Sequence, residues 1–236
     1  MMDIALPESL AQARERLHQA LLEVKRPLND ATLLAVSKTK PAPLIRQAYA
    51  LGQRAFGENY LQEALDKQTE LADLNDIVWH FIGPLQSNKT RAVAEHFDWM
   101  HSVDRLKVAN RLSEQRPGHL APLNICLQVN ISREASKSGV MPEDVRALAH
   151  EVAQLPRLRL RGLMAIPAPA DTLEAQRKPL AELRHLLTEL QTTLPQAPLD
   201  TLSMGMSDDL EAAVMEGATL VRLGTAIFGA RGAVNS

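Results

Sequence analysis

The stretch TLLAVSKTK, from Thr32 to Lys40, decides the expected fold of this chain. Leu33 to Ser37 form a short, largely aliphatic run bounded by polar residues, a pattern typical of a strand that is buried on both faces of a parallel sheet. Pro41 then opens a helical pattern. Lys38 is therefore expected at the carboxyl end of a buried strand, which is the edge where α/β proteins hold their ligands.

Two interpretations of Lys38 are open at this point. A lysine at such an edge can lose solvent, lower its pKa and attack a carbonyl carbon as an amine nucleophile. Lys38 and Lys40 can also be solvated loop residues, and the strand alone favours this second interpretation because most lysines are exposed. The other strand ends of the chain must decide between the two.

Strand and helix patterns alternate along the rest of the chain. This alternation implies a parallel sheet, and eight such units after one leading helix suit a single-domain (β/α)8 TIM barrel over residues 1–236. A doubly wound open sheet is the alternative, but it would carry a glycine-rich fingerprint after its first strand, where Ser37-Lys38-Thr39 stands instead. The expected strands are 33–37, 54–56, 77–82, 99–103, 122–131, 158–166, 201–206 and 220–228.

Several helix ends carry capping signals. The leading helix is expected from Pro7 to Lys25, with Ser9 as its N-cap. Asp104 is expected to cap the helix after the fourth strand, and Asp208 with Glu211 to form a capping box after the seventh. Residues 57–59 are expected in a turn, and further helices at 41–51, 60–71, 88–97, 142–154 and 173–190.

The composition argues against several classes of function. The chain has 236 residues, a formal net charge of −2 and 3% aromatic residues, so neither a basic field nor stacking surfaces favour nucleic acid or membrane partners. Cys126 is the single cysteine, which indicates a reducing compartment. The amino terminus lacks the apolar segment of a signal peptide, and no apolar run reaches membrane-spanning length. We expect a cytoplasmic protein, and no HxH, HExxH or CxxC spacing supports a metal site.

In a barrel, the carboxyl ends of all strands face one pocket, so every strand end supplies a candidate site residue. The ends of the seventh and eighth strands read Gly205 to Ser207 and Leu223 to Thr225, at the place where barrels usually hold a phosphate group. In the alternative interpretation, Ser207 only caps a helix and Gly224 only relieves packing. The strand-end residues are Lys38, Asn59, Gly83, His101, Asn130, Met164, Ser207 and Thr225.

Arg222 is the remaining unusual residue of this edge. Strand alternation gives it the same face as Gly224, and an arginine that points into a barrel is costly unless it meets a ligand or a carboxylate. A lysine nucleophile, a phosphate grip and an inward arginine together suggest a phosphorylated carbonyl ligand. Pyridoxal 5'-phosphate (PLP) fits all three features.

Seven segments between Leu33 and Arg231 carry a family resemblance: LLAVSKTKP, FGENYLQEA, WHFIGPLQSNK, VNIS with KSG, LRGLMAIP, LSMGMSDDLEAAV and VRLGTAIFGAR. They resemble the pyridoxal phosphate homeostasis protein family, the bacterial YggS-like proteins and their eukaryotic relatives. The resemblance implies a barrel like the N-terminal domain of alanine racemase, with PLP on Lys38 as a Schiff base. It also implies phosphate contacts from Ser207, Gly224 and Thr225, Arg222 against the pyridine nitrogen, Asn59 near the ring, and a pocket lined by Met206 and the strand from His80 to Gly83.

His80 has a second interpretation, because a histidine between Trp79 and Phe81 is more often a satisfied core residue than a ligand. The role of Arg222 also bears on activity. A cation beside the pyridine nitrogen disfavours its protonation and weakens the ring as an electron sink, so carbanion chemistry is less supported. Alanine racemase also takes a catalytic tyrosine from a second domain, and we expect none here because the chain ends at Ser236, directly after the eighth unit.

The expected function is therefore reversible PLP binding on Lys38, without a catalytic acid–base residue, in the intracellular homeostasis of vitamin B6 and amino acids. The expected protein is a monomer whose candidate recipients are PLP-dependent apoenzymes. The first alternative is a PLP-dependent amino-acid racemase or lyase that uses the same lysine. A weaker alternative is a cofactor-free aldolase that forms a Schiff base with a sugar phosphate.

Overall fold

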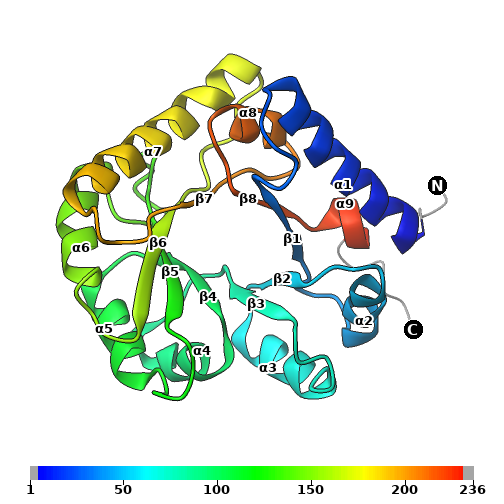
Figure 1. Ribbon diagram of the computed structural model, residues 1–236, viewed down its shortest axis with the longest axis horizontal. Coiled ribbons are helices and arrows are strands. Elements are labelled where there is room, and N and C mark those ends of the chain that lie inside the picture. Colours follow the sequence, from blue (N-terminus) through cyan, green and yellow to red (C-terminus); the bar gives the residue numbers. More distant parts are fainter. Residues whose placement is uncertain (1–4, 231–236) are drawn as a thin grey trace.

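Eight parallel strands close into a barrel in the computed structural model of the chain, which describes residues 5–230 (Figure 1). Each strand pairs with the next one in sequence, and the last strand pairs with the first. This arrangement confirms the predicted α/β barrel. The strands are β1 (Thr32–Val36), β2 (Ala55–Glu58), β3 (Val78–Phe81), β4 (Trp99–Val103), β5 (Leu123–Gln128), β6 (Leu158–Met164), β7 (Thr201–Ser203) and β8 (Leu220–Leu223).

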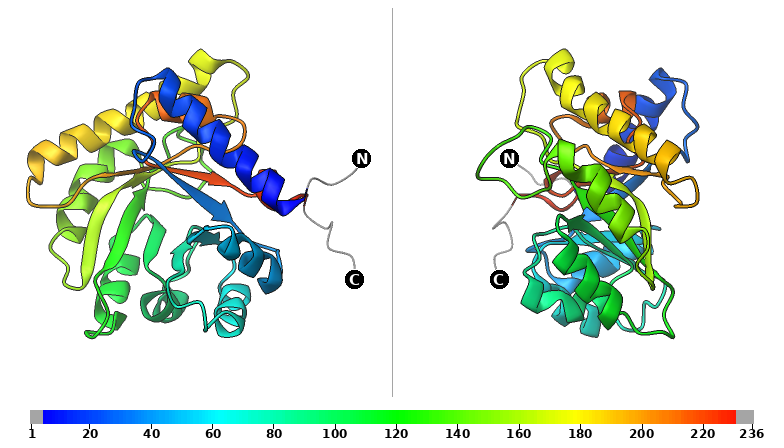
Figure 2. Two further views of the ribbon diagram at one scale, coloured as in Figure 1. Left: turned by 45° about the vertical axis from the view of Figure 1, so that its right-hand side comes forward. Right: turned by 90° about the vertical axis from the view of Figure 1, so that its left-hand side faces the viewer.

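The helices form an outer ring around the strands (Figures 1 and 2). Two short 3-10 helices, η1 (Ser87–Lys89) and η2 (Pro142–Asp144), lead into α4 and α6 of this ring. No helix within residues 5–230 combines the length and the apolar character that crossing a membrane requires. The α-helices are α1 (Leu6–Glu23), α2 (Ala42–Ala50), α3 (Leu61–Glu70), α4 (Thr90–His96), α5 (Leu106–Gln115), α6 (Val145–Val152), α7 (Leu173–Thr193), α8 (Leu210–Met215) and α9 (Thr225–Phe228).

The leading helix α1 lies on the outside of the barrel beside the last strand–helix unit. The helix after β8, α9, has only four residues, and α1 packs against both α9 and α8 (Figure 2). The buried residues of α1 recur every three or four positions, as expected for an amphipathic helix. Ser9 is not the N-cap, contrary to the expectation: the helix begins after Ala5, and the Ser9 hydroxyl donates to the Ile227 carbonyl at 2.6 Å.

Side chains along each strand alternate between two environments. One set packs between the sheet and the helices in a continuous apolar core, to which Ala35 of β1 belongs. The other set points into the barrel, where Leu34 of β1 is in register with Arg222 of β8. A Cβ atom on Gly57 would lie 3.1 Å from the side chains of both Leu34 and Ile82, so glycine at this position lets the interior side chains close over it.

Two expectations about strand ends are wrong. Glu58 belongs to β2 instead of the expected turn, and its side chain is fully buried. The segment Thr225–Phe228 is helical, because β8 ends at Leu223 and the chain turns at Gly224 into α9. Its apolar and β-branched residues resemble a strand locally, yet the paired part of β8 is only four residues long.

Two capping expectations are also wrong. Asp104 does not cap α5, because its carboxylate accepts a hydrogen bond from the Gly139 backbone N–H at 3.1 Å. The capping box after β7 does not form either, because Glu211 is bound by Arg16 of α1 at 2.8 Å. In both places a contact with a distant part of the chain takes the side chain away from its local role.

Candidate functional site

The turn after β1 presents Lys38 at the mouth of the barrel. Strand alternation gives Lys38 the same face as Leu34, which points inward. The side chain of Lys38 is exposed to water. The described residues therefore do not shield it from solvent in the way that the first interpretation of Lys38 requires. The next residue, Thr39, has a φ of 64°, a left-handed conformation that costs energy for a non-glycine residue. Lys40 is buried and donates to the Ala230 carbonyl, just after α9, at 2.8 Å.

A buried ion pair holds this turn from behind. Lys67 of α3 donates from Nζ to the Glu58 carboxylate at 2.6 Å and to the Ser37 carbonyl at 2.7 Å. The Ser37 hydroxyl donates to the second carboxylate oxygen of Glu58 at 2.9 Å. Burial raises the pKa of the Glu58 carboxyl, whereas Lys67 and the Ser37 hydroxyl act in the opposite direction. We call Ser37, Glu58 and Lys67 the ion-pair cluster. The bonds of Glu58 and Lys67 hold Ser37, the residue directly before Lys38, in place.

Asn59 follows β2 at the same edge of the barrel. A Cβ atom on Gly83 would lie 2.4 Å from the Asn59 carbonyl oxygen, so glycine at position 83 lets the backbone after β3 press against Asn59. The side-chain oxygen Oδ1 of Asn59 is buried and accepts no hydrogen bond from any described residue. A buried acceptor without a donor is costly, so this atom fits a ligand that brings a donor.

The loops after β7 and β8 adjoin the Lys38 turn. Gly205 has a φ of 105°, and a Cβ atom there would lie 2.7 Å from that of Ala213, so the loop after β7 needs glycine at this position. Met206 is 45% exposed and Ser207 is half-buried, so both are accessible at the mouth.

On the other side, a Cβ atom on Gly224 would lie 3.3 Å from the Val36 carbonyl oxygen, which places the start of α9 next to the strand that leads to Lys38. Thr225, the first residue of α9, is exposed. The structure therefore brings Lys38, Gly224 and Thr225 to one edge, with Met206 and Ser207 on the neighbouring loop.

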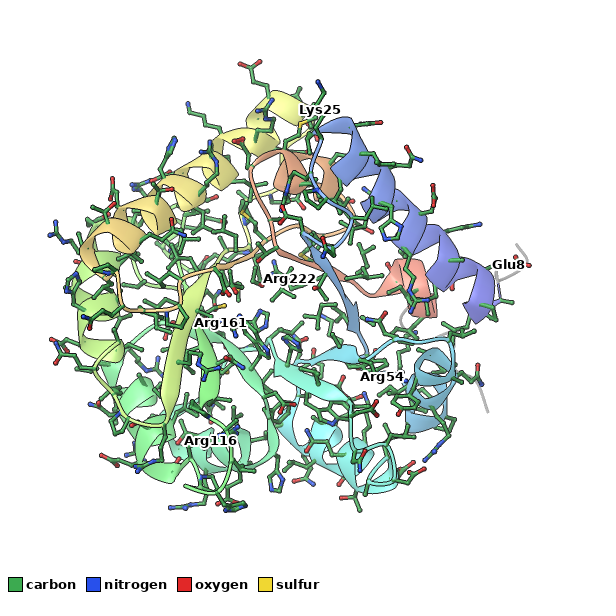
Figure 3. All side chains as sticks on the ribbon, viewed as in Figure 1. Glu8, Lys25, Arg54, Arg116, Arg161 and Arg222 are labelled. Carbon is green, nitrogen blue, oxygen red and sulfur yellow. The ribbon has the colours of Figure 1, made fainter. Side chains whose placement is uncertain are left out.

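Arg222 lies near the centre of the barrel and is 5% exposed (Figure 3). It donates to the Ser203 hydroxyl at 2.7 Å and to the Ala165 carbonyl at 3.1 Å. The ring of His101 lies 2.8 Å from the Ser203 hydroxyl through Nδ1, and its Nε2 lies 2.8 Å from Nδ1 of His80. We call His80, His101, Ser203 and Arg222 the interior chain, which occupies space that aliphatic side chains usually fill in such barrels.

One arrangement of protons satisfies every hydrogen bond of the interior chain with neutral histidines. Arg222 can only donate, so the Ser203 oxygen accepts from it, and in this arrangement the Ser203 hydroxyl donates to Nδ1 of His101. Nε2 of His101 then carries hydrogen and donates to Nδ1 of His80. Both rings are neutral in this arrangement, and burial lowers the pKa of His80 to about 3 and that of His101 well below its usual value. Burial also lowers the pKa of Arg222 to about 10.

His80 was expected to line the ligand pocket, and the structure places it inside the barrel. Its ring is buried inside the barrel and bound to His101. It borders a hollow of about 710 Å³ together with Thr32 and Val78, which begin β1 and β3. That hollow opens at the opposite end of the barrel from Lys38. His80 therefore matches the core interpretation given to it by its apolar neighbours in sequence.

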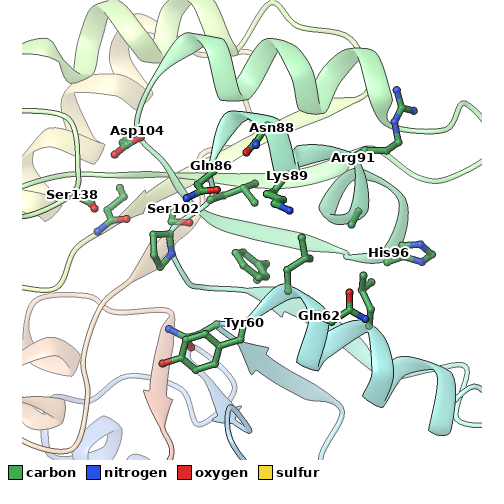
Figure 4. Close-up of a pocket in the computed structure, with 18 of the residues that line it drawn as sticks. Tyr60, Gln62, Gln86, Asn88, Lys89, Arg91, His96, Ser102, Asp104 and Ser138 are labelled. Carbon is green, nitrogen blue, oxygen red and sulfur yellow. The ribbon is translucent and has the colours of Figure 1, made fainter.

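A second hollow, of about 1070 Å³, extends the barrel mouth on the side of β2 to β5 (Figure 4). Asn59 borders it, as do Ser102 and Asp104 after β4 and Gln128 at the end of β5. Lys38 is not among its lining residues. The strand ends on this side therefore leave open space beside Asn59, and His101 and Met164, two other strand-end candidates, are buried beneath the mouth.

The sequence analysis missed the ion-pair cluster and Ser203. A signal for Lys67 was present, because it lies on the same stripe of α3 as the buried residues Ala64 and Leu71. A lysine on an apolar stripe needs a buried partner. Its partner Glu58 was not recognised, because residues 57–59 were expected to form a turn. Among the described residues, no group of three or more His, Cys, Asp or Glu side chains could hold a metal ion.

Known proteins resemble this chain over almost its full length. The family model for the N-terminal domain of alanine racemase matches residues 12–232. A pyridoxal phosphate homeostasis protein of Pseudomonas aeruginosa is 63% identical over 226 residues, which cover 96% of this chain and 96% of that protein. One of Escherichia coli is 54% identical over 233 residues, 98% of each chain. The structure of PipY from Synechococcus elongatus with PLP bound has a TM-score of 0.83 at 43% identity, covering 95% of this chain and 100% of that chain.

Proposed function

This chain belongs to the alanine racemase N-terminal domain family, among its pyridoxal phosphate homeostasis proteins, and from that premise we propose that it binds PLP at the barrel mouth and serves the intracellular balance of this cofactor. The observation that carries the proposal is the constellation at one edge: an exposed lysine, a buried arginine with neutral partners, and two glycine-containing loops after β7 and β8. PipY, a structural relative, is known with PLP bound.

The residues present fit PLP on chemical grounds. Arg222 forms no ion pair with any described residue, and its hydrogen bonds to them use two of its five N–H groups. A cation with donors to spare suits an uncharged pyridine nitrogen, which accepts a hydrogen bond and carries no competing charge. The unpaired oxygen of Asn59 suits a ring substituent that donates. Ser207, Gly224 and Thr225 would hold the phosphate group, with Met206 beside it.

Lys38 would hold the cofactor covalently. PLP would supply an aldehyde, and the Lys38 amine would bond to its carbon with the release of one water molecule. The ion-pair cluster keeps the preceding residue, Ser37, in place while the exposed side chain of Lys38 reaches the aldehyde. Because that side chain is open to water, the same bond can be hydrolysed, which suits storage and delivery better than chemistry that must exclude water.

We therefore favour a carrier over an enzyme, acting as a monomer toward PLP-dependent apoenzymes in the cytoplasm. Arg222 argues against carbanion chemistry of the transaminase type, because a cation at the pyridine nitrogen weakens the ring as an electron sink, but it does not separate a carrier from a racemase. An amino-acid racemase or lyase is the second candidate, supported by the match to the alanine racemase domain. Incubation of the PLP-loaded protein with L-alanine separates the two: a carrier produces D-alanine no faster than free PLP does, whereas a racemase exceeds that background by orders of magnitude.

Mass spectrometry after borohydride reduction tests the binding proposal directly. Purified protein incubated with PLP should carry a pyridoxyl group on the peptide that contains Lys38, and Lys38→Ala should carry none there. Lys40 provides the internal control, because it is buried and bonded to the Ala230 carbonyl and should stay unmodified. No adduct on the wild-type protein, or an adduct on Lys40 or Lys137 in place of Lys38, would contradict the proposal.

A further inference from the structure

Helix α1 stands outside the eight strand–helix units, yet it makes polar contacts with the loop after β7 and with α9, the helix that begins at Thr225, and the proposed function assigns both to the phosphate group. Arg16 donates from Nη2 to the Ser207 carbonyl at 2.6 Å, in the loop after β7. Ser9, two turns earlier in α1, donates to the Ile227 carbonyl of α9 at 2.6 Å. The helix therefore connects the two phosphate loops from their outer side (Figure 2).

The guanidinium of Arg16 is held in place by Glu211. Its Nε and Nη2 atoms each lie 2.8 Å from the Glu211 carboxylate, so the guanidinium is held by both oxygens of this group. Such two-point pairs fix the plane of the guanidinium. Arg16 is thereby kept in one orientation, and Glu211 balances its charge. The second N–H of Nη2 donates to the Ser207 carbonyl.

The bond to the Ser207 carbonyl also sets the direction of the next N–H group. In a trans peptide the C=O and N–H groups point in opposite directions. Because Arg16 draws the Ser207 carbonyl toward α1, the Asp208 N–H points away from α1. This N–H has no backbone acceptor among the described residues. It is therefore available to an anion on the inner side of the loop, together with the Ser207 hydroxyl.

We propose that Arg16 is the positioning residue of the phosphate site and gives the barrel its preference for phosphorylated pyridoxal over pyridoxal itself. This inference rests on the proposed function and deepens it. Arg16 does not touch the ligand. It holds the loop after β7 in the shape that the phosphate oxygens require, while Lys38 and Arg222 on other strands engage the aldehyde and the ring.

The test compares the affinity for PLP with that for pyridoxal, which lacks the phosphate group. In Arg16→Gln the affinity for PLP should fall by about tenfold, the effect of losing one charge-assisted hydrogen bond, while the affinity for pyridoxal stays within about twofold. Absorbance titration of each ligand gives both constants. Arg16→Lys, which can still reach one carbonyl, should recover part of the PLP affinity.

Arg26 provides a matched control on the same side of the barrel. It donates to the Val214 and Ala218 carbonyls at 2.7 and 2.8 Å and pairs with Asp30, but these carbonyls lie in the last turn of α8 and just after it, not in a phosphate loop. Arg26→Gln should lower the melting temperature and leave the ratio of the two affinities unchanged. If Arg16→Gln lowers both affinities equally, or neither, the inference is wrong. If the wild-type protein binds neither ligand, the proposed function fails instead.

Discussion

Two groups of buried polar side chains in this barrel, the ion-pair cluster and the interior chain, satisfy their charges in different ways. In the ion-pair cluster, between the sheet and α3, Lys67 and Glu58 carry opposite charges and lie 2.6 Å apart. In the interior chain, Arg222 is the one charged member, and its partners are a hydroxyl, a carbonyl and, further along, two neutral histidines. Lys67 also lies 3.6 Å from the Glu63 carboxylate. The cation of the first group is therefore met by carboxylates, whereas Arg222 forms no ion pair with any described residue.

The difference in charge pairing suggests that the ion-pair cluster has a structural role and that the interior chain has a role in ligand binding. Because Glu58 and Glu63 both face Lys67, the ion-pair cluster has no free cation to offer a ligand, and its role is to position the turn that carries Lys38. An unmatched cation at the centre of the barrel retains donors for a molecule that enters from the mouth. Four predictions test this distinction through the free energy of unfolding, in order of decreasing size.

Removal of Lys67 should have the largest effect. In Lys67→Met the buried Glu58 carboxylate loses its cation, and we expect the free energy of unfolding to fall by about 3–5 kcal/mol in urea titrations at neutral pH. Arg46→Gln, which breaks the exposed pair with Asp73, should leave the unfolding midpoint near that of the wild type. Equal effects of the two variants would show that the cluster contributes no more than a surface pair.

Acid should reduce the defect of Lys67→Met. Burial already raises the pKa of Glu58, and loss of Lys67 raises it further in the folded state. Below that pKa and above the usual value of 4.5, the folded variant binds a proton that the unfolded chain does not, so its stability relative to the wild type rises as the pH falls. A difference that stays constant from pH 7 to pH 5 would contradict this account.

The interior chain should make the wild-type protein less stable as the pH falls, because its histidines are buried in the neutral form. The pKa of His80 is about 3 in the folded state against 6.5 ordinarily, so its contribution is complete above 6.5 and is lost as the pH falls toward 3. Between pH 7 and pH 5 this residue alone should lower the free energy of unfolding by about 2 kcal/mol. In His80→Gln the pH dependence should be flatter, whereas the exposed His119→Gln should keep the wild-type slope.

Replacement of Lys38 should have the smallest effect on stability. Its side chain is exposed, so Lys38→Ala should change the free energy of unfolding by no more than about 0.5 kcal/mol without ligand. Added PLP should stabilise the wild type and raise its melting temperature more than that of the variant. A loss of about 2 kcal/mol or more in the absence of ligand would show that Lys38 belongs to the structural group together with Lys67.

The architecture could be predicted from the sequence because each strand and helix carries its own pattern. The strand from Trp99 to Val103 has the predicted bounds, and β1 differs by one residue at each end. The exceptions have tertiary causes. Glu58 resembles a turn residue next to Gly57 and Asn59, and only its buried contact with Lys67 of α3 explains its place in β2. Glu211 resembles a capping residue until Arg16, 195 positions away, binds it.

The positions of the candidate site residues at strand ends could be predicted, but the side chains that contact them could not. Lys38, Gly224 and Thr225 stand at strand ends, which any barrel brings to one edge, and the structure places them there. Their roles toward PLP stay predictions. The partners of Arg222 could not be predicted, because Ser203 and His101 come from strands far apart in sequence and no local pattern links them.

The position of α1 has a consequence for the order in which the molecule matures during synthesis. A ribosome delivers α1 and β1 first, but their partners in α8, β8 and α9 are translated last, with 191 positions between Arg16 and Ser207 and 218 between Ser9 and Ile227. Until β8 emerges, the edge of β1 has no neighbour on that side and the apolar stripe of α1 lacks its main partners, α8 and α9. Closure of the ring and completion of the phosphate loops are therefore one late event, so a nascent chain acquires its capacity to hold a ligand only when its fold is finished.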